Sequence, residues 1–313
     1  MNRVNIILFF VFFVLWALLG GCGGPSSFVG RGYEAAPPVR IDELPTELAA
    51  VQEKLDESQP GKAVKLVNKW IKENEDSEFM DRALFLKGEA LFEKKSYLKA
   101  YESYEELLDG YSTSRFFEPA LHKEMEIAHQ FLTGVRRKLW GFIPIRAYSE
   151  AVEILDGIVE HWPLSELSAE ALMMQADFFF NEGRFLEAQG TYLLLVEHYG
   201  KSRYFESALL GGAESSQAQY EGSFYDGGCL MEARYQYERY QALYPARADQ
   251  LGIGQRIERI DWQEGERSYK TADYYQRTDR REAACFYFDY ITQRWPGSVW
   301  ARRSEESLQA RER

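Results

Sequence analysis

Helical signatures recur along most of this chain at a nearly constant spacing, and this repeat constrains the fold more than any other feature. The dipeptide Ala-Leu begins at Ala83, Ala120, Ala171 and Ala208, at intervals of 37, 51 and 37 residues. A second alanine lies early in the other helix of each pair, at Ala63, Ala100, Ala151, Ala188, Ala233 and Ala284. Five of these second helices end on an aromatic residue followed by serine, glycine or proline, at Tyr111, Trp162, Tyr199, Tyr244 and Trp295. Units of this length bury their apolar faces only by stacking on one another.

The repeat predicts an all-α fold, a right-handed helical solenoid of about five to six helix pairs over residues 42–313. Small residues such as Gly88 and Ala100 let two helices approach, and aromatic rings such as Tyr104 fill the space between them. These residues, together with Leu91 and Tyr97, resemble the tetratricopeptide motif. Two insertions, near residues 133–146 and 220–229, interrupt the repeat, and loops added to a solenoid often carry binding specificity.

The first 22 residues predict export and lipid attachment. Arg3 precedes an apolar run of 14 residues, from Ile6 to Leu19, which suits a signal peptide and is short for a membrane-spanning helix. The sequence Leu-Gly-Gly before Cys22 resembles the lipobox of bacterial lipoproteins, which implies that residues 1–21 are removed and that Cys22 carries acyl chains. The alternative is an ordinary signal peptide. Residues 22–41 are rich in glycine and proline and predict a flexible tether.

Composition and motifs exclude several classes of function. A formal net charge of −12 argues against nucleic-acid binding. The chain contains no glycine-rich phosphate loop, nucleophile elbow or His-Glu-x-x-His motif, so we expect no enzyme, no cofactor and no metal site. The trio of His122, Glu126 and His129 shares a helical face but fits solvated polar residues better than metal ligands.

The remaining histidines and cysteines receive structural interpretations. His161 and His198 occupy the same position of two repeats, which indicates a structural role. Cys229 and Cys285 either form a disulfide or remain as two buried thiols, and their number fits both.

Acidic residues occupy one position of five first helices. They stand five residues after the repeated leucine in four pairs and just after Ala272 in the last, at Glu89, Glu126, Asp177, Glu214 and Asp273. The tetratricopeptide resemblance implies that this position faces the inner groove of the solenoid. Phe92 and Phe180 follow three residues later on the same face. We expect this acidic ladder to bind an extended peptide segment; the alternative is that it keeps the groove solvated.

The first insertion predicts a contact loop. Arg136, Arg137 and Lys138 form a dense basic cluster, and Trp140 and Phe142 follow directly. Basic residues beside an apolar tip suit lipid headgroups or an acidic groove of a partner. The alternative is that Trp140 and Ile143 fold back onto the solenoid and bury the loop.

The lipobox, the tether and the helix pairs ending in aromatic-proline signals together resemble the BamD (YfiO) family of outer-membrane lipoproteins. This resemblance covers roughly residues 42–300. It implies a scaffold on the periplasmic face of the outer membrane that holds assembly-machine subunits or unfolded outer-membrane proteins. The alternative function is a periplasmic adaptor for another envelope or cell-wall complex, and a lipoprotein enzyme is the third possibility.

Overall fold

The computed structural model describes residues 45–139, 143–222 and 227–312, and one compact unit, Leu44–Arg313, contains every described helix. The helices and strands, in chain order, are α2 (Thr46–Asp56), α3 (Pro60–Glu73), α4 (Met80–Glu93), α5 (Tyr97–Gly110), α6 (Phe117–Leu132), β1 (Arg136–Leu139), β2 (Ile143–Arg146), α7 (Tyr148–His161), α8 (Glu166–Asn181), α9 (Phe185–His198), α10 (Phe205–Ala218), α11 (Gly228–Leu243), α12 (Pro245–Leu251), α13 (Ile253–Arg277), α14 (Arg281–Arg294) and α15 (Val299–Glu312).

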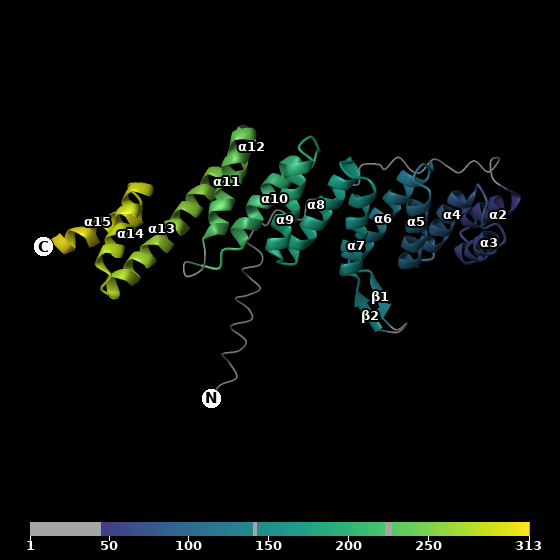
Figure 1. Ribbon diagram of the computed structural model, residues 1–313, viewed down its shortest axis with the longest axis horizontal. Helices are drawn as coiled ribbons and strands as arrows, with labels where there is room; N and C mark the ends of the chain where they lie inside the picture. Colours follow the sequence, from purple (N-terminus) through teal and green to yellow (C-terminus); the bar gives the residue numbers. More distant parts are fainter. Residues whose placement is uncertain (1–44, 140–142, 223–226, 313) are drawn as a thin grey trace, which may run out of the picture. The chain divides into compact units, whose positions relative to one another are not determined.

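The helices form consecutive antiparallel pairs that stack in chain order, as the sequence predicts (Figure 1). The pairs are α2–α3, α4–α5, α6–α7, α8–α9, α10–α11 and α13–α14, and each packs mainly against the pair before and the pair after it. The alanines that mark the second helices are all fully buried. Because a methyl group allows close approach, each alanine lies where one helix crosses its neighbours. The predicted all-α solenoid is therefore confirmed.

Most pairs share the same residue types at the end of the second helix and at the turn between the two helices. The five predicted aromatic stops are the C-terminal caps of α5, α7, α9, α11 and α14. Within a pair, a residue with positive φ ends the first helix, at Ser58, Lys95, Gly134, Gly183 and Asp279. The following backbone N–H then bonds to the carbonyl five residues back, as in Ser96 to Leu91 and Arg184 to Phe179, both 2.9 Å. This is the Schellman arrangement, which satisfies carbonyls left over at a helix end.

Glycine is required where an aromatic ring lies against a helix backbone. A Cβ atom placed on Gly88 in α4 would lie 2.2 Å from Cε1 of Tyr104 in α5. The Tyr104 ring is fully buried. The predicted role of Gly88, close approach of the two helices of a pair, is thus what the packing requires.

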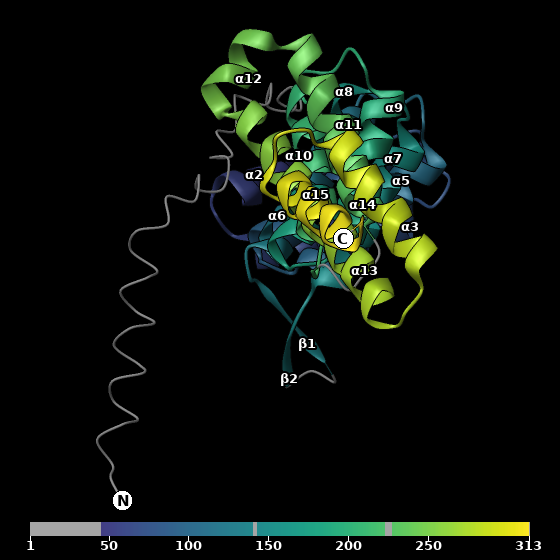
Figure 2. The same cartoon turned by 90° about the vertical axis from the view of Figure 1, so that its left-hand side faces the viewer.

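The insertion near residues 133–146 corrects one expectation, because the sequence after residue 42 indicated only helices. Strands β1 and β2 pair antiparallel, with Arg136 opposite Arg146 and Leu139 opposite Ile143. The hairpin projects from the body of stacked helices between α6 and α7 (Figure 2). Ile143 and Ile145 stand two residues apart, before Arg146, which is a short strand signal that the helical period around it hides.

Other expectations fall partly outside the described residues. The signal peptide, Cys22 and most of the tether precede residue 45 and stay predictions. Cys229 in α11 and Cys285 in α14 form no disulfide in the part of the chain that is described. None of the described helices is both long and apolar enough to cross a membrane.

Candidate partner-binding surfaces

The five ladder carboxylates all lie on first helices and are all partly exposed. Glu89 is on α4, Glu126 on α6, Asp177 on α8, Glu214 on α10 and Asp273 on α13. Two successive members, Glu89 and Glu126, share one lysine. Lys123 Nζ lies 3.5 Å from carboxylates of both Glu89 and Glu126, which joins two neighbouring pairs.

Tyrosines of the second helices donate hydrogen bonds to two of the ladder carboxylates, which the sequence analysis did not predict. The hydroxyl of Tyr104 donates to Glu89 Oε1 at 2.6 Å, and that of Tyr192 donates to Asp177 Oδ1 at 2.5 Å. Burial and the neighbouring carboxylates raise the pKa of both hydroxyls well above the ordinary value, so both remain donors at neutral pH. The sequence could have indicated both pairs, because each tyrosine follows its acid by 15 residues.

Basic side chains of the chain itself pair with the other ladder residues. Arg256 contacts Glu214 and lies near the hydroxyl of Tyr237, 3.3 Å away. Asp273 pairs with Arg277 at 3.0 Å. The ladder thus carries less free negative charge than its composition indicates, which weakens the expected attraction for a basic peptide.

The two phenylalanines beside the ladder also have intramolecular partners. Phe92 packs edge-on against Tyr97 at 5.2 Å, and Phe180 packs against Phe185 at 5.4 Å. Tyr97 and Phe185 are the first residues of α5 and α9. These rings therefore stabilise the turn between the two helices of a pair, in addition to any contact with a ligand.

Only part of the predicted contact loop can be placed. Arg136 is exposed at the start of β1, while Trp140 and Phe142 and the side chains of Arg137 and Lys138 lie outside what the structure describes. At the base of the hairpin, Arg146 Nη1 donates to the hydroxyl of Tyr148 at 2.7 Å. Tyr148 in turn packs edge-on against Phe178, with ring centroids 4.8 Å apart. The hairpin is thereby fixed to the solenoid at its base.

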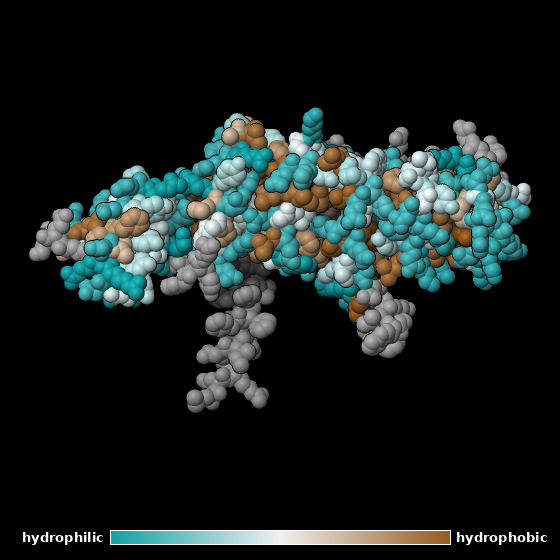
Figure 3. Space-filling view, viewed as in Figure 1, coloured by the Kyte–Doolittle hydropathy of each residue, from teal (hydrophilic) through white to brown (hydrophobic). Residues whose placement is uncertain are grey.

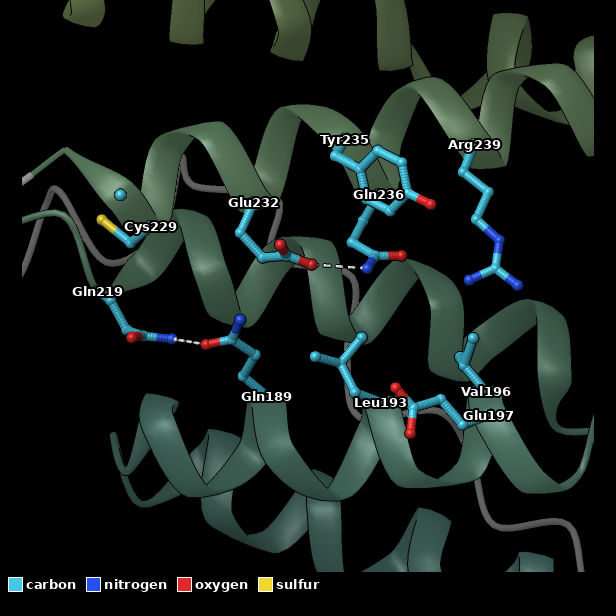
Figure 4. A pocket seen from close by; sticks show the side chains of 11 residues that line it. Gln189, Leu193, Val196, Glu197, Gln219, Cys229, Glu232, Tyr235, Gln236 and Arg239 are labelled. Carbon is cyan, nitrogen blue, oxygen red and sulfur yellow. Dashed lines mark hydrogen bonds between the residues drawn. The ribbon is translucent and has the colours of Figure 1, made fainter.

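A groove that sequence reasoning did not find runs between the second helices α9 and α11 (Figure 4). It has a volume of about 600 Å³. Three glutamines line it, and Gln219 Nε2 donates to Gln189 Oε1 at 2.6 Å while Gln236 Nε2 donates to Glu232 Oε1 at 2.7 Å. The other lining residues are Leu193, Val196, Glu197, Gly228, Cys229, Tyr235 and Arg239.

Exposed apolar side chains accompany this groove. Tyr235 on its wall is 58% exposed, and Met231, one helical turn earlier on α11, is 62% exposed. On α9, Leu186 and Leu194 are also exposed. Hydrophobic residues show at the surface over helices α8–α11 (Figure 3). Large exposed apolar side chains beside a concave surface are typical of protein-binding sites.

Comparison with known proteins finds relatives of similar structure and low identity. No family model matches the chain, and no curated protein matches it. The C-terminal part of a tetratricopeptide repeat-containing protein from Cytophaga hutchinsonii is 12% identical, with a TM-score of 0.39, over 82% of this chain and 86% of that one. A tetratricopeptide repeat protein from Parabacteroides merdae is 14% identical, with a TM-score of 0.36, over 84% of this chain and 96% of that one.

The fold is a solenoid of antiparallel helix pairs, as the packing of these pairs on one another shows. A third similar structure, the type IV pilus biogenesis factor PilW, is 15% identical with a TM-score of 0.28, over 82% of this chain and 96% of that one. The role of the chain has to be argued from its own surfaces.

Proposed function

We propose that this protein is a lipid-anchored, non-enzymatic scaffold on the periplasmic face of the outer membrane, where it binds segments of partner proteins in envelope assembly. Solenoids of this fold are protein-interaction scaffolds in general. The resemblance to the BamD family supports the finer role, because it combines the lipobox at Cys22 with helix pairs that end in aromatic residues.

The groove between α9 and α11 is the observation that carries this proposal. Gln219 and Gln236 use their Nε2 donors within the chain, so the Nε2 donor of Gln189 and the carbonyl oxygen of Gln219 are the amide groups that suit the N–H and C=O groups of an extended backbone. Tyr235 and Met231 offer apolar area beside these polar groups. Together they fit one extended segment with a large apolar side chain.

The acidic ladder is the second proposed contact. Glu89, Glu126 and Glu214 keep 26%, 36% and 33% of their side-chain surface exposed despite their internal partners. An incoming basic side chain would compete with Lys123 and Arg256 for these carboxylates. Binding at the ladder is therefore expected to be weak and to decline with salt.

The experiment is affinity capture from a detergent-solubilised envelope fraction with the full chain as bait. We expect co-purification of barrel-assembly subunits and a loss of at least tenfold when Tyr235 and Met231 are both changed to serine. Tyr274→Ser in α13 is the matched control, because Tyr274 is 53% exposed and does not line the groove. Recovery of cell-wall or division proteins in place of barrel-assembly subunits would favour the periplasmic adaptor. Capture that the double variant leaves unchanged would contradict the groove assignment.

The anchor is tested separately by mass spectrometry of the mature amino terminus. We expect a chain that begins at Cys22 and carries diacylglycerol and an amide-linked acyl chain. An unmodified terminus at another residue would contradict lipid anchoring and leave the protein as a soluble periplasmic scaffold.

A further inference from the structure

Three titratable side chains meet where α5 and α7 pack together. Glu105 and Asp109 are one turn apart on α5, and His161 is the last residue of α7. Each offers one ligand atom, and these atoms all lie within 4.8 Å of one another. His161 Nε2 is 3.5 Å from Glu105 Oε1, and both side chains are mostly buried, with 19% and 26% exposed.

A third acid, Glu124 of α6, lies next to Glu105 but outside the group of atoms that lie within 4.8 Å of one another. Glu124 is fully buried, and neither of its carboxylate oxygens has a hydrogen-bond partner. Its carboxyl faces Glu105, with Asp109 close by. Oε1 of Glu105 is likewise buried without a hydrogen bond. An unpartnered carboxylate in such a place is costly unless a positive charge compensates it.

The next pair of helices holds the same constellation with one decisive difference. Asp156 follows Ala151 by five residues, as Glu105 follows Ala100, and Gln175 takes the place of Glu124, three residues after the repeated leucine. There Gln175 Nε2 donates to Asp156 Oδ1 at 2.8 Å, so an amide satisfies the acid. Glu124 offers no amide hydrogen to Glu105, so either a proton or a cation has to neutralise these two acids.

We propose that Glu105, Asp109 and His161 bind a divalent transition-metal ion of the zinc class between α5 and α7, and that the charge of this ion compensates the neighbouring buried Glu124 of α6. One imidazole nitrogen with carboxylate oxygens is a donor set for zinc and its neighbours in the first transition row, whereas magnesium and calcium prefer oxygen alone. The ion neutralises the carboxylates that bind it and offsets the cost of burying Glu124 beside them. This site contradicts the expectation that the chain binds no metal. It also makes His161 a metal ligand, whereas its position in the repeat indicated only a structural role.

The position of the ion near the β1–β2 hairpin gives it a structural role. Helices α6 and α7 are the two that carry the β1–β2 hairpin between them. A metal ion bound by α5 and α7, with Glu124 of α6 beside it, would hold the base of the hairpin in one geometry. The proposal does not depend on which partner the scaffold binds.

The test is calorimetric titration of the metal-free, tag-free full chain in detergent with zinc chloride alone. We expect one zinc ion per chain and a raised melting temperature. His161→Gln and Glu124→Gln should each weaken zinc binding at least tenfold. Glu124→Gln should still fold, since it reproduces the Gln175 arrangement. His198→Gln, the equivalent histidine of the next pair, should bind zinc as the wild type does.

Two results would overturn the proposal. One is the absence of zinc binding by the wild-type chain, which would leave a proton shared between Glu105 and Glu124 as the neutralising group. The other is zinc binding that His161→Gln and Glu124→Gln leave unchanged, which would place the ion at a surface pair such as His122 and Glu118. X-ray absorption of the loaded chain supports the site if it reports nitrogen and oxygen ligands near about 2.0–2.1 Å.

Discussion

At the scale of single residues, tyrosine–carboxylate pairs connect the two helices of a repeat. Tyr192 donates to Asp177, and its ring lies against Gly211 of the next pair, where an added Cβ would be 2.6 Å from the ring. One side chain therefore joins two neighbouring repeats. Removing its hydroxyl would leave a largely buried carboxylate without its donor, a change that costs about 1–3 kcal/mol.

Asp177 gives this pairing a dependence on pH. Burial raises the pKa of Asp177 in the folded state, and the bond from Tyr192 only partly offsets this. The folded protein then binds a proton more readily than the unfolded chain, so stability at this site rises as pH falls through the raised pKa toward the ordinary value near about 4.

The matching measurement compares denaturant unfolding of the wild type and Asp177→Asn across pH 4 to 8. We expect the stability of the wild type relative to the variant to increase as pH falls. A difference that stays flat, or that shrinks toward acid, would mean that the carboxyl is as readily ionised in the folded state as in the unfolded chain.

At the scale of helices, packing depends on small residues at a few crossings. Gly88→Ala would bring a Cβ atom against the ring of Tyr104, which is buried and tied to Glu89, so neither helix has room to yield. We expect a loss of about 1–3 kcal/mol in unfolding free energy. Thermal or urea unfolding measures it.

Gly190→Ala is the matched control for that variant. Gly190 is an exposed position within α9, and nothing lies within 4 Å of an added Cβ atom. Alanine should stabilise the helix there by about 0.5–1 kcal/mol. If both substitutions shifted stability alike, close helix approach at Gly88 would not be the reason for its glycine.

The sequence predicts these helices well and the sites between them poorly. The repeated alanines mark helix crossings because close packing there requires a small side chain. The aromatic stops mark helix ends because capping is a local property of the chain. The groove beside Tyr235 depends on the spacing of α9 and α11, and the Glu124 cluster depends on three helices meeting, so neither leaves a pattern along the chain. The β1–β2 hairpin was missed because the helical period dominates the sequence around it.

At the scale of the whole described solenoid, stability is a sum over neighbours. The last helix, α15, covers α13 with Trp300, whose indole Nε1 donates to the carbonyl of Trp262 at 3.0 Å and whose ring packs on Tyr269 at 5.6 Å. Deleting residues 299–313 should therefore loosen α13 and α14 and leave distant pairs unaffected.

Hydrogen exchange of the truncated chain measures this directly. We expect amides of α13 and α14 to exchange faster while those of α4 to α9 keep their protection. Uniform loss of protection along the chain would show that the helix pairs unfold as one cooperative unit.

The central claim, that this solenoid binds a partner protein in the groove between α9 and α11, is tested most directly by site-specific photocrosslinking in living cells. A photoreactive amino acid replaces Tyr235 in one strain and Tyr274 in another. The account predicts a covalent adduct with one defined partner from position 235, absent at position 274 and lost when Gln189 and Leu193 are changed to alanine. Adducts of equal yield at both positions, or none at position 235, would contradict it.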